Sequence, residues 1–232
     1  MPLSLSSSAR LRRPALIAIL LIPMLLLTGA EREKEKDRDN KPQAGAARPP
    51  AAIEDGVAVF FSPDGGCEFA IVEQIRHARK SIDMQAYSFT NTEIASALAA
   101  AQDRGVKVRA IFDKDATGDH YSGATYCVHH DIACYTDGEH SIAHNKLMIL
   151  DGNVVITGSF NFTKQAERSN AENLLILTGK RRLTAAYQRN FEEHLGHSKV
   201  YTKDEAEKDQ QEREAKNEAK NKDKDDRGKK ER

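Results

Sequence analysis

The chain has 232 residues, of which 39% are hydrophobic and 30% are charged, and its 35 basic residues are balanced by 35 acidic ones. This length is sufficient for one domain with tails. Residues 51–200 carry 15 basic and 19 acidic side chains, a formal net charge of −4. The composition therefore excludes a strongly basic domain of the kind that would by itself indicate nucleic-acid binding.

Residues 1–30 have the composition of an export signal. Three arginines precede an apolar run over residues 15–27, and small residues end the stretch at Ala30. This run is shorter than the roughly 20 apolar residues that a bilayer-crossing helix needs. We therefore expect cleavage after Ala30 and a periplasmic or secreted mature protein, with an uncleaved membrane anchor as the alternative.

Strands and helices alternate through the middle of the chain. Short apolar runs predict strands, and apolar residues at helical spacing predict helices, the second of which begins at Asn91. The predicted strands are 57–61, 81–87, 106–112, 132–135, 146–150, 154–157 and 173–177, and the predicted helices are 68–80, 91–104 and 181–195. Residues 113–126 are polar and rich in turn formers. The alternation predicts an α/β fold with a mixed β-sheet flanked by helices, in which the late hairpin is antiparallel.

Charged segments flank this region. Residues 31–50 are charged and then rich in Pro and Ala, which predicts a flexible linker. In residues 201–232, 22 of 32 positions are charged without a periodic apolar stripe, which predicts disorder or a solvated single helix. The predicted organisation is a signal peptide (1–30), a linker (31–50), a globular domain (51–200) and a charged tail (201–232).

The chain contains three cysteines, an odd number. Cys127 and Cys134 are close enough in sequence to bridge a small loop, and the partner of Cys67 stays open. A Cys/His metal site is an alternative, because three histidines lie in the same stretch: His120, His129 and His130. The C-x2-C spacing typical of zinc sites is absent. We therefore expect a disulfide or buried thiols, and no metal.

The Asp151-Gly152 pair lies between two apolar runs, which is a strong signal for a two-residue hairpin turn. If these residues form the centre of the turn, Leu150 pairs with Asn153, and His144 lies opposite Ser159. A three-residue turn would shift this pairing by one residue, but the polar side chains would still gather at one end of the hairpin.

Two further polar residues belong to this cluster. Lys146 lies two residues from His144, and Asn161 lies two residues beyond Ser159, so each pair shares a face of its strand. Gly158 lets the backbone leave the strand without a side chain in the way. Together these groups offer a nucleophile and several donors, which suits the binding and attack of an anionic group such as a phosphodiester.

Carboxylates are scarce around this hairpin. A two-metal nuclease would need several clustered carboxylates as ligands, whereas the nearby acids are Asp151 at the turn and Glu172 beyond it. The sequence therefore favours a reaction that uses no metal.

The hairpin residues form a specific motif. His144-Asn145-Lys146, followed after four residues by Asp151 and after six more by Gly158-Ser159-Phe160-Asn161, resembles the H-x-K-x4-D-x6-G-[SG]-x-N motif of the phospholipase D superfamily. The stretches SIDMQAYSFTNTEIASAL, VKVRAIFDKD and GSFNFTKQAERSNAENLLIL look like the small bacterial endonucleases of that superfamily, which have one motif per chain. The resemblance covers residues 56–197 and implies a phospholipase D-like α/β sandwich as the catalytic domain.

The resemblance also implies a mechanism. His144 would be the nucleophile that forms a phosphohistidine, and the equivalent histidine of a second subunit would serve as general acid and then general base. Because the chain has a single motif, the resemblance implies a symmetric homodimer with the active site across the two-fold axis.

The remaining motif residues receive supporting roles from the same resemblance. Lys146, Ser159 and Asn161 would bind the phosphate, and Glu172 would orient the catalytic imidazole. Asp151 and Gly158 would be structural parts of the motif. Plainer interpretations remain for Glu172, as an acid paired with a surface base, and for Ser159 and Asn161, as turn caps. Four histidines outside the motif are interpreted as ordinary surface or core residues: His77, His140, His194 and His197.

These observations predict a metal-independent phosphodiesterase without a cofactor, most specifically a non-specific endonuclease for DNA, with RNA as a second substrate. The alternative is a phospholipase D or cardiolipin-type lipid phosphodiesterase, which would make membrane lipid a partner. The mature sequence has no amphipathic or aromatic-rich segment suited to a membrane surface, which favours nucleic acid. A third hypothesis, an inactive nucleic-acid-binding module, is disfavoured by the intact motif.

Overall fold

The computed structural model describes residues 49–115, 117 and 122–230, and the side chains up to residue 220 within these ranges. The predicted signal peptide (1–30), nearly all of the predicted linker (31–50) and His120 lie outside the described residues. None of the described helices is both long and apolar enough to cross a membrane.

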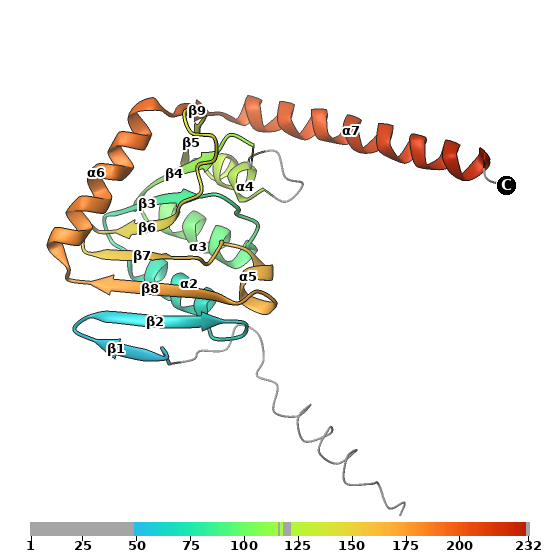
Figure 1. The fold of residues 1–232 in the computed structure, drawn as a ribbon. Coiled ribbons are helices and arrows are strands. Elements are labelled where there is room, and N and C mark those ends of the chain that lie inside the picture. Colours follow the sequence, from blue (N-terminus) through green and yellow to red (C-terminus); the bar gives the residue numbers. More distant parts are fainter. Residues whose placement is uncertain (1–48, 116, 118–121, 231–232) are drawn as a thin grey trace, which may run out of the picture. The chain divides into compact units, whose positions relative to one another are not determined.

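A nine-stranded sheet runs through the domain in the order β1-β2-β8-β7-β6-β3-β4-β5-β9 (Figure 1). The pairs β3–β4 and β4–β5 are parallel, and the other neighbouring pairs are antiparallel. This mixed sheet confirms the predicted α/β class. The strands are β1 (Ala52–Glu54), β2 (Val57–Ser62), β3 (Ser81–Ala86), β4 (Lys107–Asp113), β5 (Ala133–Asp137), β6 (Lys146–Leu150), β7 (Val154–Gly158), β8 (Glu172–Thr178) and β9 (Lys199–Tyr201).

Helices cover both faces of this sheet (Figure 1). One face packs against α2 and α3, which contribute most of the large core, and the opposite face packs against α6. The helices are α2 (Cys67–His77), α3 (Thr92–Asp103), α4 (Gly123–His129), α5 (Lys164–Arg168), α6 (Arg181–His197) and α7 (Lys203–Lys230).

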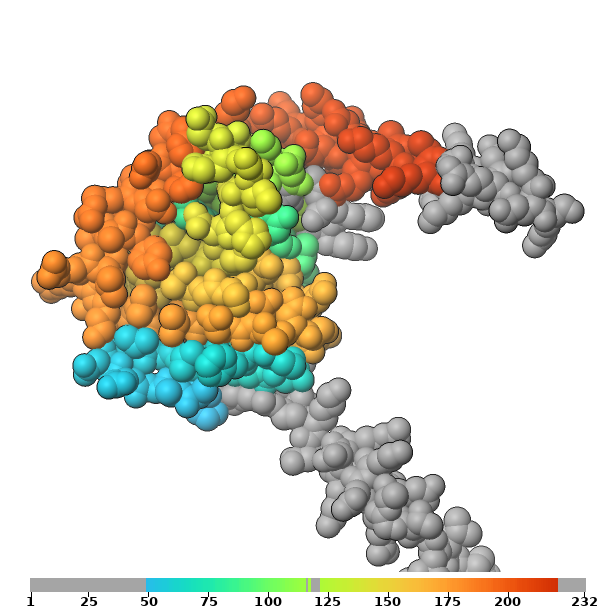
Figure 2. All heavy atoms as spheres, viewed as in Figure 1, coloured from blue at the N-terminus to red at the C-terminus, as the bar shows by residue number. Residues whose placement is uncertain are grey.

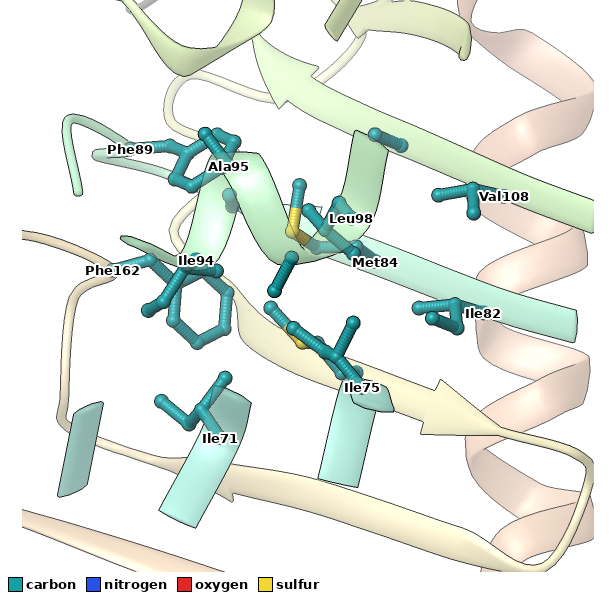
Figure 3. Close-up of a cluster of buried hydrophobic side chains, with 14 of the residues drawn as sticks. Ile71, Ile75, Ile82, Met84, Phe89, Ile94, Ala95, Leu98, Val108 and Phe162 are labelled. Atoms are coloured by element: carbon teal, nitrogen blue, oxygen red, sulfur yellow. The ribbon is translucent and has the colours of Figure 1, made fainter. Parts of the chain in front are cut away.

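The continuous apolar sequence of β6 follows from this two-sided packing. Side chains alternate along a strand, so Met148 and Leu150 enter the large core, whereas Leu147 and Ile149 pack toward α6 around Phe191. A central strand buried on both faces needs apolar residues at successive positions. Figure 3 shows the large core, in which side chains of α2 and α3 surround those of β3: Ile71, Ile75, Ile94, Ala95, Leu98, Ile82 and Met84.

The start of α3 agrees with the helix start predicted at Asn91. The Asn91 side-chain oxygen accepts hydrogen bonds from the backbone N–H groups of Glu93 at 3.0 Å and Ile94 at 3.1 Å. These N–H groups belong to the first turn of the helix, where backbone N–H groups have no acceptor within the helix. Gly105, with φ of 86°, follows the helix in the left-handed conformation that glycine adopts readily. Local sequence thus fixes both ends of this helix.

Some elements differ from the expectation. The predicted loop over 113–126 ends in α4, whose first turn is capped by the Ser122 hydroxyl. Residues 203–230 form α7, within the segment expected to be disordered or a single helix. Its first turns are anchored to the domain, because Ala206 is fully buried and Asp209 accepts hydrogen bonds from the Tyr201 and Thr117 hydroxyls at 3.0 and 3.1 Å.

The three cysteines are buried free thiols. A hydrogen bond with the Cys127 thiol, together with burial, raises the pKa of Cys134 well above its ordinary value. Burial also raises the pKa of Cys67 to about 12. Among the described residues, His129 and His130 take part in no group suited to a metal ion. Of the expected alternatives, buried thiols are the state found here.

Candidate active site

The β6–β7 hairpin is antiparallel as predicted, but its turn has three residues. Leu150 pairs with Val154, not with Asn153, and Asp151 and Gly152 have φ values of 54° and 64°. The Asn153 N–H donates to the Leu150 carbonyl at 3.0 Å. The expected pairing is therefore wrong by one residue, and His144 does not lie directly opposite Ser159.

The Asp151 carboxylate explains this longer turn. It accepts hydrogen bonds from the backbone N–H groups of Lys80 at 2.7 Å, Arg79 at 2.9 Å and Ser81 at 3.0 Å. Burial raises the pKa of Asp151, but these amide hydrogen bonds outweigh it and hold the pKa below its ordinary value. Asp151 thus fastens the turn to the start of β3, about 16 Å from Lys146 at ~3.3 Å per strand residue.

The other motif residues meet at the opposite edge of the sheet, where several strand ends lie together. Lys146 begins β6 and pairs with Ala86 at the end of β3. Glu172 begins β8 and pairs with Ser62 at the end of β2. Gly158 ends β7, between these strands in the sheet order. Antiparallel neighbours therefore bring side chains that are far apart in sequence to one edge.

His144 and Lys146 form the first part of the site. Lys146 is only 8% exposed, whereas His144 is exposed. The Lys146 ammonium donates to His144 Nδ1 at 3.0 Å and to the His144 carbonyl at 2.8 Å. The Tyr87 ring packs against both groups, 4.5 Å from the imidazole centroid and 5.1 Å from Lys146 Nζ. Burial lowers the pKa of Lys146, partly opposed by the charge of Glu172.

Ser159 and Glu172 form the second part of the site. The Ser159 hydroxyl donates to Glu172 at 2.6 Å and accepts the Asn173 N–H at 3.1 Å, and Asn170 donates to the other Glu172 oxygen at 3.0 Å. The expected hydrogen bond from His144 to Glu172 is not formed among the described residues, where Ser159 and Asn170 are the side-chain donors to this carboxylate. Sequence reasoning missed Asn170 and Tyr87, which carry no motif signal.

Gly158 places Ser159 through the backbone. It has φ of 149°, and a Cβ at this position would lie 2.3 Å from the Asn173 carbonyl oxygen. The N–H groups of Ser159 and Phe160 donate to that same oxygen at 3.2 and 3.3 Å. Any larger residue at 158 would therefore push β7 away from the start of β8.

Asn161 contributes an unsatisfied group. Its side-chain oxygen is buried and has no hydrogen-bond partner in the part of the chain that the structure describes. Leaving such an atom unpaired costs about 1–3 kcal/mol, so a water or ligand that donates to it recovers this free energy. Because this oxygen only accepts, Asn161 would bind a phosphate through its amide N–H groups and not through this atom.

Sequence reasoning also missed a second polar cluster. His140, His194 and His197, interpreted as ordinary residues, surround the fully buried Asp137 carboxylate. Their ring nitrogens lie 3.1, 2.7 and 3.2 Å from the same carboxylate oxygen. The spacing of His194 and His197, one helical turn apart, is the signal that could have indicated it.

Comparison with known proteins agrees with this architecture. Residues 71–195 match the family model for the cardiolipin synthase, PLD-like domain. The chain is 42% identical over 135 residues to a phospholipase D of Rickettsia prowazekii, an alignment that spans 58% of this chain and 65% of that protein. It is 36% identical over 115 residues to a mitochondrial cardiolipin hydrolase of Xenopus tropicalis, which spans 50% and 54% of the two chains.

A solved structure shows the same fold. The Nuc protein of Salmonella typhimurium, a phospholipase D family member, superimposes with a TM-score of 0.61 at 34% sequence identity, covering 63% of this chain and 97% of Nuc. NucT of Helicobacter pylori shares the fold at 23% identity, with a TM-score of 0.58. With a family model matched over more than half of its length and its motif at one sheet edge, the chain belongs to the phospholipase D superfamily.

Proposed function

We propose that this protein is a phosphodiesterase that cleaves nucleic acid, with DNA as its main substrate, through a phosphohistidine at His144. The observation that carries the proposal is the exposed His144 imidazole held against the nearly buried Lys146 ammonium. A nucleophile that solvent can reach, next to a cation in a less polar surrounding, suits attack on a phosphodiester whose charge grows in the transition state.

The contact between the two side chains suggests how substrate activates the nucleophile. An ammonium can only donate, so it takes the lone pair of His144 Nδ1, and a neutral ring in this state carries its proton on Nε2. An incoming phosphate attracts the ammonium to its own oxygens. The ring proton can then move to Nδ1, which leaves the Nε2 lone pair free to attack phosphorus.

The reaction needs a general acid as well. When His144 bonds to phosphorus, the bond to the leaving oxygen breaks, and that oxygen requires a proton. Within the described part of the chain, His144 contacts Lys146 and Tyr87 and no second imidazole. We assign the acid to His144 of the partner subunit in a homodimer. The same ring then removes a proton from the water that hydrolyses the phosphohistidine.

The match to Nuc favours nucleic acid as the substrate. This chain has one motif, as the small bacterial endonucleases do, and its alignment covers 97% of Nuc. Contacts to backbone phosphates carry no base information, so we expect little sequence preference. With the export signal predicted for residues 1–30, the enzyme would act in the periplasm or outside the cell. A lipid phosphodiesterase is the second candidate, supported by the relatives named phospholipase D and mitochondrial cardiolipin hydrolase.

A substrate panel tests the proposal. Purified protein is given supercoiled plasmid, single-stranded DNA, RNA and cardiolipin-containing vesicles side by side, with EDTA added at the start of each assay. We expect nicking of the plasmid by the wild type and by His77→Ala, an exposed histidine outside the motif. We expect none by His144→Ala, with the dimer retained in light scattering.

Two results would contradict the proposal. Cleavage by His144→Ala at the wild-type rate would show that His144 is not the nucleophile. Hydrolysis of the vesicles without cleavage of any nucleic acid would replace the proposed substrate by lipid and establish the second candidate.

A further inference from the structure

Four side chains from separate elements converge away from the phosphodiesterase motif. The Asp137 cluster consists of Asp137 at the end of β5, His140 in the following loop, and His194 and His197 in the last turn of α6. One ligand atom from each residue lies within 4.8 Å of all the others. Figure 2 shows the yellow-green residues after β5 lying against the orange residues at the end of α6.

Imidazole nitrogens surround the buried Asp137 carboxylate. Three ring nitrogens, those of His194, His140 and His197, lie 2.7, 3.1 and 3.2 Å from a single oxygen of Asp137. A carboxylate oxygen has two lone pairs, and the other Asp137 oxygen already accepts the Glu139 N–H at 3.0 Å. His140 Nδ1 also lies 3.3 Å from this second oxygen, so both oxygens of the buried carboxylate face imidazole nitrogens.

Electrostatic repulsion disfavours a positive charge on all three rings at once. The three imidazole centroids are only 4.8 to 5.3 Å apart. Three imidazolium ions at these distances would face a single buried carboxylate, and like charges so close disfavour one another. Neutral rings that turn their lone pairs toward a shared cation avoid this repulsion.

We propose that Asp137, His140, His194 and His197 bind a divalent transition-metal ion, with Zn²⁺ as the ion that fits best. Three imidazoles and a carboxylate form a ligand set typical of zinc, whereas Mg²⁺ and Ca²⁺ prefer oxygen ligands. Zinc bonds of about 2.0–2.1 Å place tetrahedral ligands roughly 3.3 Å apart. The ring nitrogens lie 2.7 to 3.2 Å from the Asp137 oxygen, and all four ligand atoms lie within 4.8 Å of one another, so the rings would turn to reach tetrahedral spacing.

The cluster is closed at its base and open at its rim. The Asp137 side chain is fully buried, those of His194 and His197 are 13% and 27% exposed, and that of His140 is 47% exposed. A metal ion can therefore enter from solvent past His140.

The position of the cluster gives the ion a structural role. His140 lies four residues before His144, in the loop that connects β5 to β6. The same loop is held at a second point, where the Ala143 N–H donates to Asp113 at 2.7 Å. An ion bound by His140 and the α6 histidines would tie this loop to the helix and so fix the base of the segment that carries His144.

Metal binding is measured directly on the full chain without a polyhistidine tag. The protein is loaded with Zn²⁺, dialysed against metal-free buffer and analysed by elemental mass spectrometry, and its affinity is titrated against a chromophoric chelator. We expect one Zn²⁺ per chain for the wild type and for His129→Ala, an exposed histidine outside the cluster. For His194→Ala and His197→Ala we expect affinity to fall by more than about 100-fold, because even loss of a residue behind the ligands costs 10- to 100-fold.

Thermal melting provides a second readout. Zn²⁺ should raise the melting temperature of the wild type and of His129→Ala, but not that of the cluster variants. If His194→Ala or His197→Ala does not fold, His140→Ala takes its place in both measurements, because His140 is 47% exposed. A wild type that retains no Zn²⁺, or cluster variants that bind it as tightly as the wild type, would overturn the proposal. His144 and Lys146 lie outside the cluster. Plasmid cleavage in the presence of chelator, at a temperature below the melting transition, therefore tests the proposed function separately from metal binding.

Discussion

Asp151 is the motif residue for which the structure predicts a purely stabilising role. Its carboxylate holds the backbone N–H groups of Arg79, Lys80 and Ser81 at the end of the hairpin remote from Lys146. Replacement by Ala or Asn should therefore lower the stability of the domain while leaving the chemistry of the folded enzyme intact.

The magnitude follows from the contacts that are lost. A hydrogen bond to a charged group contributes about 1.5–3 kcal/mol when buried, and less, about 1 kcal/mol, where water can replace it as at this partly exposed turn. Three such bonds amount to about 3 kcal/mol, and Ala at φ of 54° adds about 1 kcal/mol of backbone strain. Asp151→Ala should thus cost about 4 kcal/mol. Asp151→Asn, which keeps one acceptor oxygen and tolerates this φ, should cost about 2 kcal/mol.

The assay is thermal unfolding together with plasmid nicking. In a domain of this size 1 kcal/mol corresponds to about 2–4 °C, so we expect the melting temperature to fall by about 8–16 °C for Asp151→Ala and about 4–8 °C for Asp151→Asn. Because the folded pKa of Asp151 is lowered, its stabilising effect is present above the unfolded pKa near 3.9 and is lost as pH falls through the folded pKa. The gap between wild type and Asp151→Asn should therefore narrow below about pH 4.

The reasoning would be refuted by either of two results. Variants that melt with the wild type would show that the three amide contacts contribute nothing to stability. A variant that is folded at the assay temperature but as inactive as His144→Ala would place Asp151 in the chemistry.

Three further substitutions probe other contacts. Lys146→Met should slow plasmid cleavage by about 100-fold or more, as expected for loss of one transition-state donor, and an unchanged rate would exclude the proposed phosphate contact. Arg109→Met leaves the buried Asp83 without the guanidinium that binds it at 2.7 and 2.8 Å, so urea denaturation should show a loss of about 3 kcal/mol, and no loss would contradict a stabilising pair. Gly158→Ala should lower stability by about 2 kcal/mol or more and reduce cleavage, because its Cβ meets the Asn173 carbonyl; wild-type melting and activity would argue against this close approach.

The elements that sequence predicts well are those with strong periodic patterns. Strands β2, β3, β6 and β7 and helix α3 lie within one or two residues of their predicted bounds, because apolar alternation, helical spacing and the Asn91 cap are local signals. The three-residue strands β1 and β9 and the seven-residue α4 were not predicted. Such short segments are ordered by pairing and packing with distant parts of the chain, not by their own propensity.

The hairpin turn illustrates how tertiary contacts override a local rule. The Asp-Gly pair favours a two-residue turn by its tolerance of positive φ. The contacts of the Asp151 carboxylate with the start of β3, 70 to 72 residues away in sequence, accompany a third turn residue. The pairing of the two strands therefore depends on residues that the hairpin sequence does not contain.

The amino-acid sequence by itself determined the α/β class and the candidate nucleophile, because apolar periodicity and motif spacing are properties of contiguous residues. Three contacts were decided by the tertiary structure alone. Lys146 donates a hydrogen bond to Nδ1 of His144, Glu172 accepts hydrogen bonds from Ser159 and Asn170, and three histidines surround Asp137. These contacts join strand and helix ends that are far apart along the chain. Their distances follow from sheet order and helix packing, which no local pattern specifies.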